Sequence, residues 1–541
     1  MIVETTQVVV IGGGATGTGI LRDLALRGIP AVLLEQGDLA HGTSGRFHGL
    51  LHSGGRYAVR DLSAAEECIR ENRILKEIAG CCIDDCGGFF VQLEGEPNDY
   101  PDQWVKACEK AGIPVEEIPV KMARELEPNL SRDVKRVFKV PDAHIDGFFL
   151  TLFNAESAVE LGAKVETYAK AIGFIMNNDK IEGVRVKDQL TGEERTIKCE
   201  MVINAAGPWA GMVASMAGVQ LEIFYDRGAL VIFHHRLNDR VINRCRLPAD
   251  GDILVPAGPV SILGTTSVKV DTPEDLSVDL EEVRYLVSLG SEVLPLLSQA
   301  RVMRVFAGVR PLYSSGQAGS AGREVSRNFE VIDHEERDGV RGFISIVGGK
   351  LTTYRLMAEV TTNLACRKLN LTTPCSTDKI PLRAPVEGEM FQEALRLLSL
   401  PVVSKAYKRL GPNIKTLLEK VKRDPAQAEI ICECELVTRA EIEMLLEGNL
   451  PGVVPIRTLR DLLRRTRLGM GPCQGTYCGY RAMLLGYAYG KWSSKAAKEE
   501  LREFLRHRWK GQQFITAGSQ VKQLAMSRKL YETSFNFSLT P

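Results

Sequence analysis

A glycine-rich turn between an apolar strand and a helix, close to the start of the chain, limits the fold more than any other feature. Residues 7–11 form a β-rich apolar run, the turn Gly12-Gly13-Gly14-Ala15-Thr16-Gly17 follows, and an apolar helical pattern begins after it. A second apolar run, 29–34, ends in Glu35, about 20 residues beyond the turn. This order of elements predicts a doubly wound α/β domain that binds a dinucleotide.

Each position of the motif has a physical reason. Gly12 makes the tight turn, Gly14 lets the backbone approach a pyrophosphate, and Gly17 lets the helix pack on the strand. The helix N-terminus supplies positive charge, and Glu35 accepts hydrogen bonds from ribose hydroxyls. We therefore expect Gly12, Gly14, Gly17 and Glu35 to bind the cofactor. The alternative is a glycine turn that serves packing alone.

Two later segments have the pattern of strands that return to the same sheet. Residues 202–209 contain an apolar run followed by Ala206 and Gly207, and residues 343–349 contain another run that ends in a glycine pair. FAD is favoured over NAD because the glycine turn lies at the extreme N-terminus and these segments come far downstream. The second glycine pair is expected to begin another helix near the flavin.

Length and charge exclude several classes of protein. A chain of 541 residues exceeds what one hydrophobic core normally serves, so two or three domains are expected. Lys plus Arg equals Asp plus Glu at 68 each, which disfavours nucleic acid as a partner. The chain has no apolar run as long as the roughly 18 residues of a membrane span and no signal-peptide pattern in its first ten residues. We expect a cytoplasmic location.

Four of the 13 cysteines have the spacing of metal ligands. Cys432 and Cys434 form one pair and Cys473 and Cys478 another, with a helical pattern between them that would bring the pairs together. Four thiolates can hold zinc or an iron–sulfur cluster. The other nine are interpreted as ordinary buried residues, with the close group Cys81, Cys82 and Cys86 as the nearest rival. Because structural zinc sites favour CxxC pairs, we expect a cluster, with zinc as the alternative.

Five further motifs resemble those of FAD-dependent glycerol-3-phosphate dehydrogenases, whose fold is like that of D-amino-acid oxidase and glycine oxidase. The motifs are HSGGRY (52–57), GTTS (264–267), AGVRP (307–311), SRNFEVIDH (326–334) and GGKLTTYR (348–355). The CxC and CxxxxC pairs resemble the bacterioferritin-associated ferredoxin module, which holds a [2Fe-2S] cluster. With these cysteines the whole chain is similar to the catalytic subunit of the anaerobic, three-subunit enzymes of the family.

The resemblance implies an α/β fold: an FAD-binding, Rossmann-like domain of the D-amino-acid-oxidase type with an interleaved β-rich substrate domain. A small, mostly helical [2Fe-2S] domain follows it. The expected divisions are 1–385 for the oxidoreductase (FAD-binding parts about 1–75, 150–220 and 335–385, with substrate-domain parts between them), 386–425 for a helical connector, 426–490 for the cluster domain and 491–541 for a helical tail.

The substrate that the resemblance implies is sn-glycerol 3-phosphate, a small dianion. It assigns substrate-binding roles to Arg56, Tyr57, Thr266, Arg310, Arg327 and Lys350. It also adds to the FAD site Thr43, Ser44, Ala206, Gly207, Gly349, Lys350, Leu351 and Thr352. Ser267 departs from the single-chain relatives, which carry an acid at that place. Arg forks and a Lys charge together suit a phosphate.

The reaction implied is hydride transfer from substrate C2 to flavin N5, giving dihydroxyacetone phosphate. The reaction also needs a group that accepts the C2 hydroxyl proton. His52 is the first choice because imidazole titrates near working pH, Lys350 is its rival, and Arg310 would supply charge. A lone His among glycines can equally be a packed or flavin-contacting residue.

The C-terminal part leaves several alternatives open. Arg464, Arg465 and Arg467 could offset cluster charge, meet a partner or form a solvated helix face. The basic amphipathic helix near 501–510 could dock a partner or lie on a membrane, but we expect it to cap the catalytic domain. The resemblance further implies a second flavin-bearing subunit, an iron–sulfur subunit that reaches the cytoplasmic face of the inner membrane, and quinone as the final acceptor.

Two other functions compete with this one. An amino-acid or 2-hydroxy-acid dehydrogenase of the same flavin fold would need one Arg for its carboxylate, whereas four candidate cations suit a phosphate better. An electron-relay or iron-storage protein would need only the cysteine module and would leave the long flavin-type segment unexplained.

Overall fold

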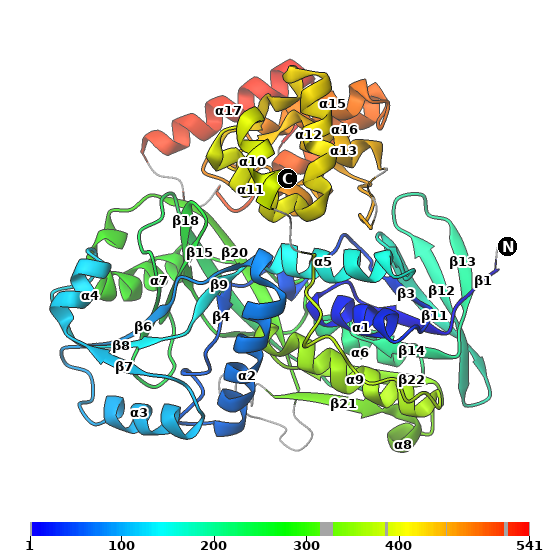
Figure 1. Ribbon diagram of the computed structural model, residues 1–541, viewed down its shortest axis with the longest axis horizontal. Helices are drawn as coiled ribbons and strands as arrows, with labels where there is room; N and C mark the ends of the chain where they lie inside the picture. Colours follow the sequence, from blue (N-terminus) through cyan, green and yellow to red (C-terminus); the bar gives the residue numbers. More distant parts are fainter. Residues whose placement is uncertain are drawn as a thin grey trace.

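The computed structural model describes residues 3–313, 328–384, 388–448, 450, 452–512, 515 and 518–539. Its central element is a six-stranded sheet whose order is β10 (Lys164–Glu166), β3 (Ala31–Leu34), β2 (Val8–Ile11), β14 (Met201–Asn204), β22 (Phe343–Gly348) and β21 (Phe329–Asp333). The first five strands are parallel and β21 is antiparallel (Figure 1). The expected return of the two later segments to the sheet of the glycine turn is confirmed, because β14 lies between β2 and β22.

Both faces of this sheet are buried, which explains its continuous apolar strands. Val8 and Val10 of β2 face one core, which they share with α1 (Ala15–Leu26), α5 (Gly147–Glu160) and α9 (Tyr354–Lys368). Val9 and Ile11 face the opposite core. That core also takes residues from α6 (Ala210–Ser215) and from a four-stranded sheet of β1 (Val3–Thr5), β13 (Glu194–Lys198), β12 (Lys180–Asp188) and β11 (Ala169–Asn177).

A nine-stranded sheet forms the second large body of the catalytic part. Its order is β19 (Val268–Val270), β15 (Phe224–Phe233), β18 (Val260–Gly264), β17 (Ile253–Ala257), β16 (Val241–Arg244), β6 (Gly88–Leu93), β8 (Val134–Val140) and β7 (Glu116–Ile118), with β20 (Val302–Leu312) also paired to β15. Its strands come from both sides of β14 in the sequence, so this β-rich body is interleaved with the dinucleotide-type sheet as the fold class predicts.

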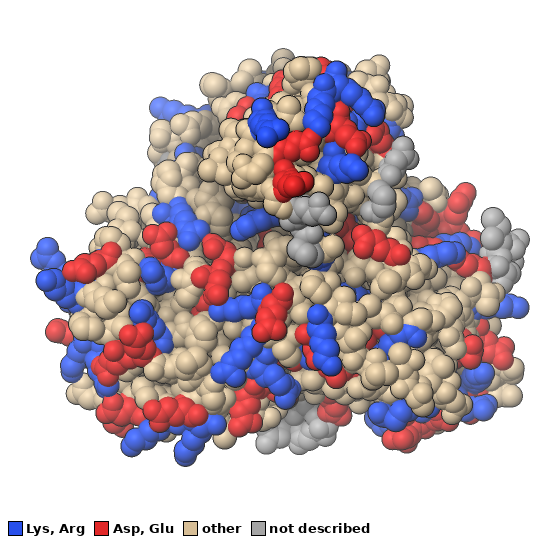
Figure 2. Space-filling view, viewed as in Figure 1, with Lys and Arg blue, Asp and Glu red and all other residues tan. Residues whose placement is uncertain are grey.

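Short elements link and cover the two bodies. They are α2 (Leu62–Ile78), α3 (Tyr100–Lys110), α4 (Val120–Leu126), α7 (Leu280–Val293), α8 (His334–Asp338) and a small sheet of β4 (Leu50–Leu51), β9 (Ala143–Ile145) and β5 (Ile83–Asp84). On the face that Figure 2 shows, acidic and basic side chains are interspersed, as equal numbers of each predict.

The C-terminal third is a helical layer that lies across the two sheets (Figure 1). Its elements are α10 (Gly388–Leu397), α11 (Leu400–Leu410), α12 (Ile414–Arg423), β23 (Ile430–Cys432), β24 (Val437–Thr438), α13 (Arg439–Glu447), α14 (Leu459–Thr466), α15 (Cys478–Ala488), α16 (Ser494–Trp509) and α17 (Ser519–Phe535). Residues 386–425 have the composition of a polar connector, yet the apolar sides of α10, α11 and α12 share a core with Ala440 and Met444 of α13.

Helix α16 completes the core of the cysteine module. Leu501, Phe504 and Leu505 are fully buried with residues of α14 and α15. The helix is therefore part of this helical layer, and it also contacts the catalytic part, because Arg304 of β20 donates to the Arg508 backbone oxygen at 3.0 Å. The segment just after it also reaches the catalytic part, because Val305 of β20 donates its backbone N–H to the oxygen of Gly511 at 2.9 Å.

The basic group before Cys473 is a fixed contact with the catalytic part. Arg465 donates two hydrogen bonds to Asp38, at 2.7 and 2.8 Å, and both side chains are buried. Arg464 donates to the same carboxylate at 3.1 Å, and Arg467 pairs with Asp146. These pairs overturn the solvated helix face as the account of this group. No helix within the described ranges is long and apolar enough to cross a bilayer.

Candidate active site

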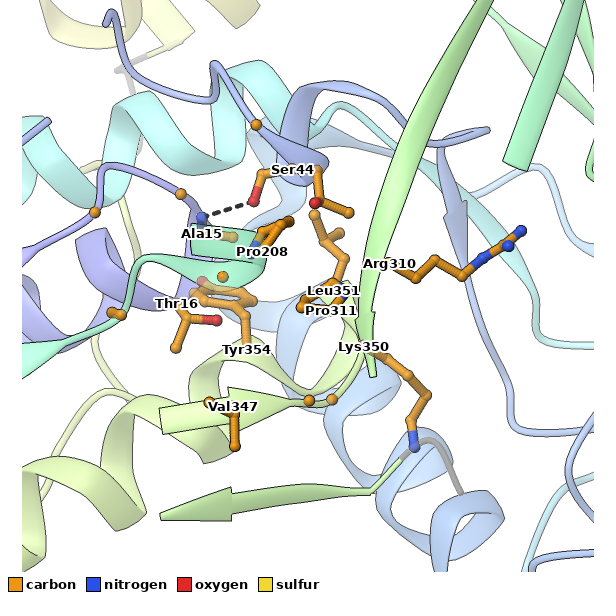
Figure 3. A pocket seen from close by; sticks show the side chains of 18 of the residues that line it. Ala15, Thr16, Ser44, Pro208, Arg310, Pro311, Val347, Lys350, Leu351 and Tyr354 are labelled. Carbon is orange, nitrogen blue, oxygen red and sulfur yellow. Dashed lines mark hydrogen bonds between the residues drawn. The ribbon is translucent and has the colours of Figure 1, made fainter. Parts of the chain in front are cut away.

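A cavity of about 950 Å³ lies between the two catalytic sheets. The sequence-predicted residues that line it are Gly12, Gly14, Glu35, Thr43, Ser44, His52, Arg56, Tyr57, Ala206, Gly207, Arg310, Gly349, Lys350, Leu351 and Thr352. Gly17 and Thr266 do not line it, and Arg327 lies outside the described residues. In Figure 3, Ser44 and Ala15 lie in one part of the site and Arg310 and Lys350 in another.

The three motif glycines have different reasons to be glycine. Gly12 has a φ of +118°, and a Cβ there would lie 2.4 Å from the oxygen of Ala205. A Cβ at Gly17 would lie 1.9 Å from the oxygen of Gly12. Gly14 has an ordinary φ of −82°, and its Cβ would meet only Ser44 Oγ, at 3.1 Å. The fold itself requires the first two, whereas Gly14 is small toward the cavity.

The positive end of α1 faces the cavity with an acceptor beside it. Ala15 donates its backbone N–H to Ser44 Oγ at 2.9 Å, the hydrogen bond drawn in Figure 3. Glu35 accepts backbone N–H groups from Gly13 and Gly37, each at 2.7 Å, and burial raises its pKa. A carboxylate has about four acceptor sites, so Glu35 keeps capacity for a ligand hydroxyl.

The returning strands bring two further turns to the same cavity. Gly207 follows β14 with a φ of +55°, and space for a Cβ is open there. Gly348 ends β22 and Gly349 follows it, with φ values of +77° and +79°. The turn leads into Leu351–Thr353 and then α9, whose Tyr354 hydroxyl accepts a hydrogen bond from Asn154 at 3.0 Å. Three strand ends of one parallel sheet thus surround the cavity, where open α/β sheets bind ligands.

The three described cations of the predicted substrate site come from separate elements and already have partners. Arg310 donates to Asp226 at 2.6 Å and also to Thr265 Oγ1. Arg56 lies 3.4 Å from Asp252 Oδ2. The Lys350 ammonium lies 5.0 Å from the centre of the Tyr57 ring, a cation–π contact. The paired carboxylates hold both guanidinium groups in position and reduce the net positive charge.

Thr266, which the prediction put in the substrate site, does not line the cavity, whereas its neighbour does. Thr266 is buried, accepts the backbone N–H of Ala229 at 2.9 Å and donates to Glu282, so its hydroxyl is occupied in the sheet. Thr265 lines the cavity instead. The GTTS motif signals that a threonine faces the site, but only the register of the chain after β18 decides which. Ser267, the departure noted above, donates to Asp226 at 2.7 Å.

Two histidines stand close together at the cavity. The His52 ring centre lies 5.5 Å from that of Tyr57 and 6.0 Å from that of His48. The backbone N–H of His52 donates to Thr352 Oγ1 at 3.2 Å. Desolvation and the Arg56 charge lower the pKa of His48 to about 3 and hold the pKa of His52 well below its usual value. Sequence reasoning missed His48, although its spacing of four from His52 was a signal.

The four predicted ligand cysteines lie together. Hydrogen bonds connect the thiols of Cys434 with Cys473, Cys473 with Cys478, and Cys478 with Cys432. These contacts lower the pKa of Cys473 and raise that of Cys478. Among the side chains that the structure describes, no three His, Cys, Asp or Glu residues are arranged to hold a metal ion. The four thiols are therefore in contact with one another, but they are not arranged around a common point as metal ligands are.

Outside this group one pair of cysteines has its thiols in contact. Cys81 Sγ lies 3.7 Å from Cys82 Sγ. Cys86 is half-buried beside a different strand and its pKa is raised by burial. The close group of three therefore does not become a ligand set.

Comparison with known proteins agrees with this geometry. Residues 7–355 match the FAD dependent oxidoreductase family. The A polypeptide of anaerobic glycerol-3-phosphate dehydrogenase from Escherichia coli (strain K12) is 42% identical over 532 residues, 98% of this chain and 96% of that protein. The A1 polypeptide of the Haloferax volcanii enzyme is 39% identical over 98% of this chain and 91% of that protein.

Among solved structures, the glycerol-3-phosphate dehydrogenase from Bacillus halodurans complexed with FAD has the same fold. The TM-score is 0.73 at 23% identity, covering 95% of this chain and 96% of that one. The match with the family, the cavity at the strand ends and the glycine turn together make FAD the cofactor. The chain belongs to the FAD-dependent oxidoreductase family and, within it, to the A subunits of anaerobic glycerol-3-phosphate dehydrogenases.

Proposed function

We propose that this chain oxidises sn-glycerol 3-phosphate to dihydroxyacetone phosphate and passes the electrons through a cluster and partner subunits to quinone. The observation that carries the proposal is the 42% identity, over nearly the full length, to the A polypeptide of an anaerobic glycerol-3-phosphate dehydrogenase. The substrate, the residue roles and the electron route below belong to this proposal.

The residues at the cavity fit FAD. The N-terminus of α1 and Ser44 would hold the pyrophosphate, with Gly14 leaving room for it. Glu35 would accept the ribose hydroxyls. Thr43, Ala206, Gly207, Gly349, Leu351 and Thr352 line the remaining length of the cavity. FAD, when bound, supplies a site that accepts a hydride.

The cations would anchor the substrate phosphate. Arg310 and Lys350 lie away from Ser44 and the α1 N-terminus in Figure 3, so they do not lie at the proposed pyrophosphate position. Arg56 lines the same cavity. A dianion would compete with Asp226 for Arg310 and with Asp252 for Arg56, and Asp252 is itself shared with Arg246, at 2.8 Å.

An amino acid or a 2-hydroxy acid is the second candidate substrate. A carboxylate needs one fork, and Arg310 alone would serve it. The presence of Arg56 and Lys350 in the same cavity favours the phosphate. Tyr57, whose ring carries the Lys350 contact, would close the apolar side of the substrate.

His52 is our choice for the group that takes the hydroxyl proton. Desolvation and neighbouring positive charge lower its pKa, so the imidazole is neutral at neutral pH and has a lone pair available for the proton. The same lowering makes the ring a weaker base than an ordinary histidine. Lys350 remains the rival because it lines the same cavity, but a charged ammonium must lose its proton before it can act as a base. Thr352 would hold the backbone of His52 in position, because its hydroxyl accepts the His52 backbone N–H.

The four-thiol group suits a [2Fe-2S] cluster better than zinc. Its CxC and CxxxxC spacing lacks the CxxC pairs typical of structural zinc, and thiolates are ligands for both. A one-electron cluster would accept electrons singly from the reduced cofactor. The proposed divisions are 1–385 for the oxidoreductase, 386–425 for the joining segment and 426–490 for the cluster domain. The segment 491–541 adds α16 to the core of the cluster domain. Two partner subunits, one flavin-bearing and one a membrane-anchoring iron–sulfur protein, would continue the path at the cytoplasmic face of the inner membrane.

Anaerobic flavin reduction tests the proposal directly. FAD-loaded chain is mixed with sn-glycerol 3-phosphate, and the loss of oxidised flavin absorbance is followed, with glycerol, a 2-hydroxy acid and an amino acid as controls. The proposal expects bleaching by the phosphate ester alone. Bleaching by the 2-hydroxy acid or the amino acid, with none by glycerol 3-phosphate, would replace it with the second candidate.

A further inference from the structure

A second cavity, of about 570 Å³, lies where the catalytic part meets the C-terminal helices. Its walls come from the segment after the glycine turn, from β20, and from α14 and α16. Ser44 and Phe47 line both cavities, so the two are neighbours. The proposed reaction takes place in the first cavity and gives this one no role.

Basic side chains dominate its polar lining. These are Arg46, Arg304, Arg464, Arg467, Arg508 and Lys510. Among its described lining residues only Asp146 and Glu274 are acidic. Arg467 pairs with Asp146, and Glu274 accepts a hydrogen bond from Trp209 Nε1 at 2.6 Å. The cavity therefore carries a surplus of positive charge.

Two buried guanidinium groups show this surplus most clearly. Arg304 and Arg508 are each 6% exposed. Arg508 donates to Gln474 Oε1 at 2.8 Å, while Arg304 donates to the Arg508 backbone oxygen at 3.0 Å and lies 3.5 Å from the same Gln474 oxygen. The hydrogen-bond partners of these two groups are neutral, and the buried Arg508 Nε has none among the described residues. Like charges held together away from water are costly unless an anion joins them.

Neither neighbouring site neutralises all of these buried positive charges. Burial and the Arg304 charge lower the pKa of Arg508, and the Cys473 and Cys478 thiols oppose that shift, so a thiolate-held cluster would partly offset that one side chain. Burial and the charges of neighbouring cations lower the pKa values of the other three groups, Arg46, Arg304 and Lys510. None of these three lines the first cavity, so FAD bound there is not their direct counter-charge.

The other walls say what kind of anion fits. Phe47, Phe148, Ile262 and Phe306 give the cavity an apolar, partly aromatic side. An inorganic anion would satisfy the cations and leave these walls uncovered. The volume falls within the roughly 300–1,000 Å³ of small-molecule sites, which are mostly apolar with a few placed polar groups.

We propose that the second cavity binds a mononucleotide, with its phosphate among Arg46, Arg304, Arg508 and Lys510 and its ring against the aromatic walls. Because Arg304 and Arg46 belong to the catalytic part and Arg508 to α16, one phosphate would join the two parts of the chain. It would do so beside Gln474, the neighbour of Cys473, and so at the junction between the two proposed redox sites.

Calorimetry on the FAD-saturated full chain tests the site. The probes are adenosine 5′-monophosphate, adenosine and inorganic phosphate, and full FAD loading keeps the probes out of the first cavity. The variants are Arg46→Gln on the catalytic side and Lys510→Gln on the module side. Lys498→Gln is the matched control, because Lys498 is an exposed cation of α16 outside both cavities. Thermal unfolding of each ligand-free variant shows whether it folds.

The expected result is that the monophosphate binds at least about tenfold more tightly than adenosine or phosphate, a difference of about 1.4 kcal/mol for each missing part. Arg46→Gln and Lys510→Gln should each weaken it about tenfold at an unchanged unfolding midpoint, and Lys498→Gln should leave it unchanged. Absence of monophosphate binding overturns the proposal, as does equal affinity in all three variants. Phosphate binding as tightly as the monophosphate overturns the nucleotide assignment.

Discussion

The glycine turn and the cysteine group hold their ligands in opposite ways. The turn offers backbone: Gly14 contributes the absence of a side chain, and the α1 N-terminus contributes N–H groups. The cysteine group offers only side chains, from two short segments about 40 residues apart in sequence. An added side chain should therefore destroy the first site, whereas the loss of one sulfur should destroy the second. The two failures should also be independent of each other.

The largest effect is expected at Gly14. Gly14→Val should abolish FAD binding, because the new side chain would occupy the pyrophosphate's path. The backbone there has an ordinary φ and the nearest protein atom is 3.1 Å from the new Cβ, so the fold should tolerate the change far better than at Gly12. Flavin content of the purified variant is the measurement. Gly80→Val is the control, since space for its Cβ is open. Stoichiometric FAD in Gly14→Val would show that the turn does not contact the pyrophosphate.

The next effect breaks the other half of the comparison. Cys473→Ser should leave FAD binding and substrate-driven flavin reduction largely unchanged, because hydride transfer uses only the first cavity. Onward turnover with quinone in the assembled complex should fall nearly to zero. Stopped-flow flavin reduction is compared with steady-state turnover and iron content, with Cys86→Ser as a control outside the thiol group. Full quinone turnover in Cys473→Ser, or zinc without iron in the native chain, would leave the module a structural role.

The same contrast explains what could be predicted from the sequence. The turn and the two returning strands have local signals, since each apolar run is followed within a few residues by its glycines. The cysteine group was predictable from spacing alone. The Thr265 and Thr266 assignment was not, because consecutive side chains alternate in direction and only the register separates them.

Charges were the least predictable feature. Arg465 stands in a run that looks solvated, but its partner Asp38 lies more than 400 residues earlier and buries it. Arg310 and Arg56 line the cavity, yet no local sequence signal indicated Asp226 and Asp252 beside them. Pairing between distant segments depends on tertiary contacts, and sequence periodicity carries no information about them.

A smaller effect is expected when the first cavity loses one cation. Arg310→Ala should weaken substrate use by about 2 to 5 kcal/mol, because the phosphate and the buried Asp226 would both lose a half-buried charged partner. The loss should appear in kcat/KM for flavin reduction, with FAD content unchanged. Arg310→Lys keeps the charge without the fork and should recover part of the loss. A lower unfolding midpoint with unchanged kinetics would make Arg310 a structural residue and leave the phosphate to Arg56 and Lys350.

The smallest expected effect is a pH dependence that stays nearly flat. An ordinary histidine, with a pKa of about 6.5, would lose about three quarters of its neutral form by pH 6. His52 has a pKa held well below that value and His48 has one of about 3, so the neutral base should persist as the pH falls. Flavin reduction at saturating substrate should change less than about twofold between pH 8 and pH 6. The cost appears in stability instead: between pH 6.5 and about 3 the unfolded chain binds more protons at these histidines, so the free energy of unfolding should decrease as the pH falls.

His52→Gln should slow reduction by about 100-fold or more at every pH if His52 is the base. An inflection near pH 6.5 in the native chain, or full activity in His52→Gln, would remove His52 from that role and leave Lys350 as the base.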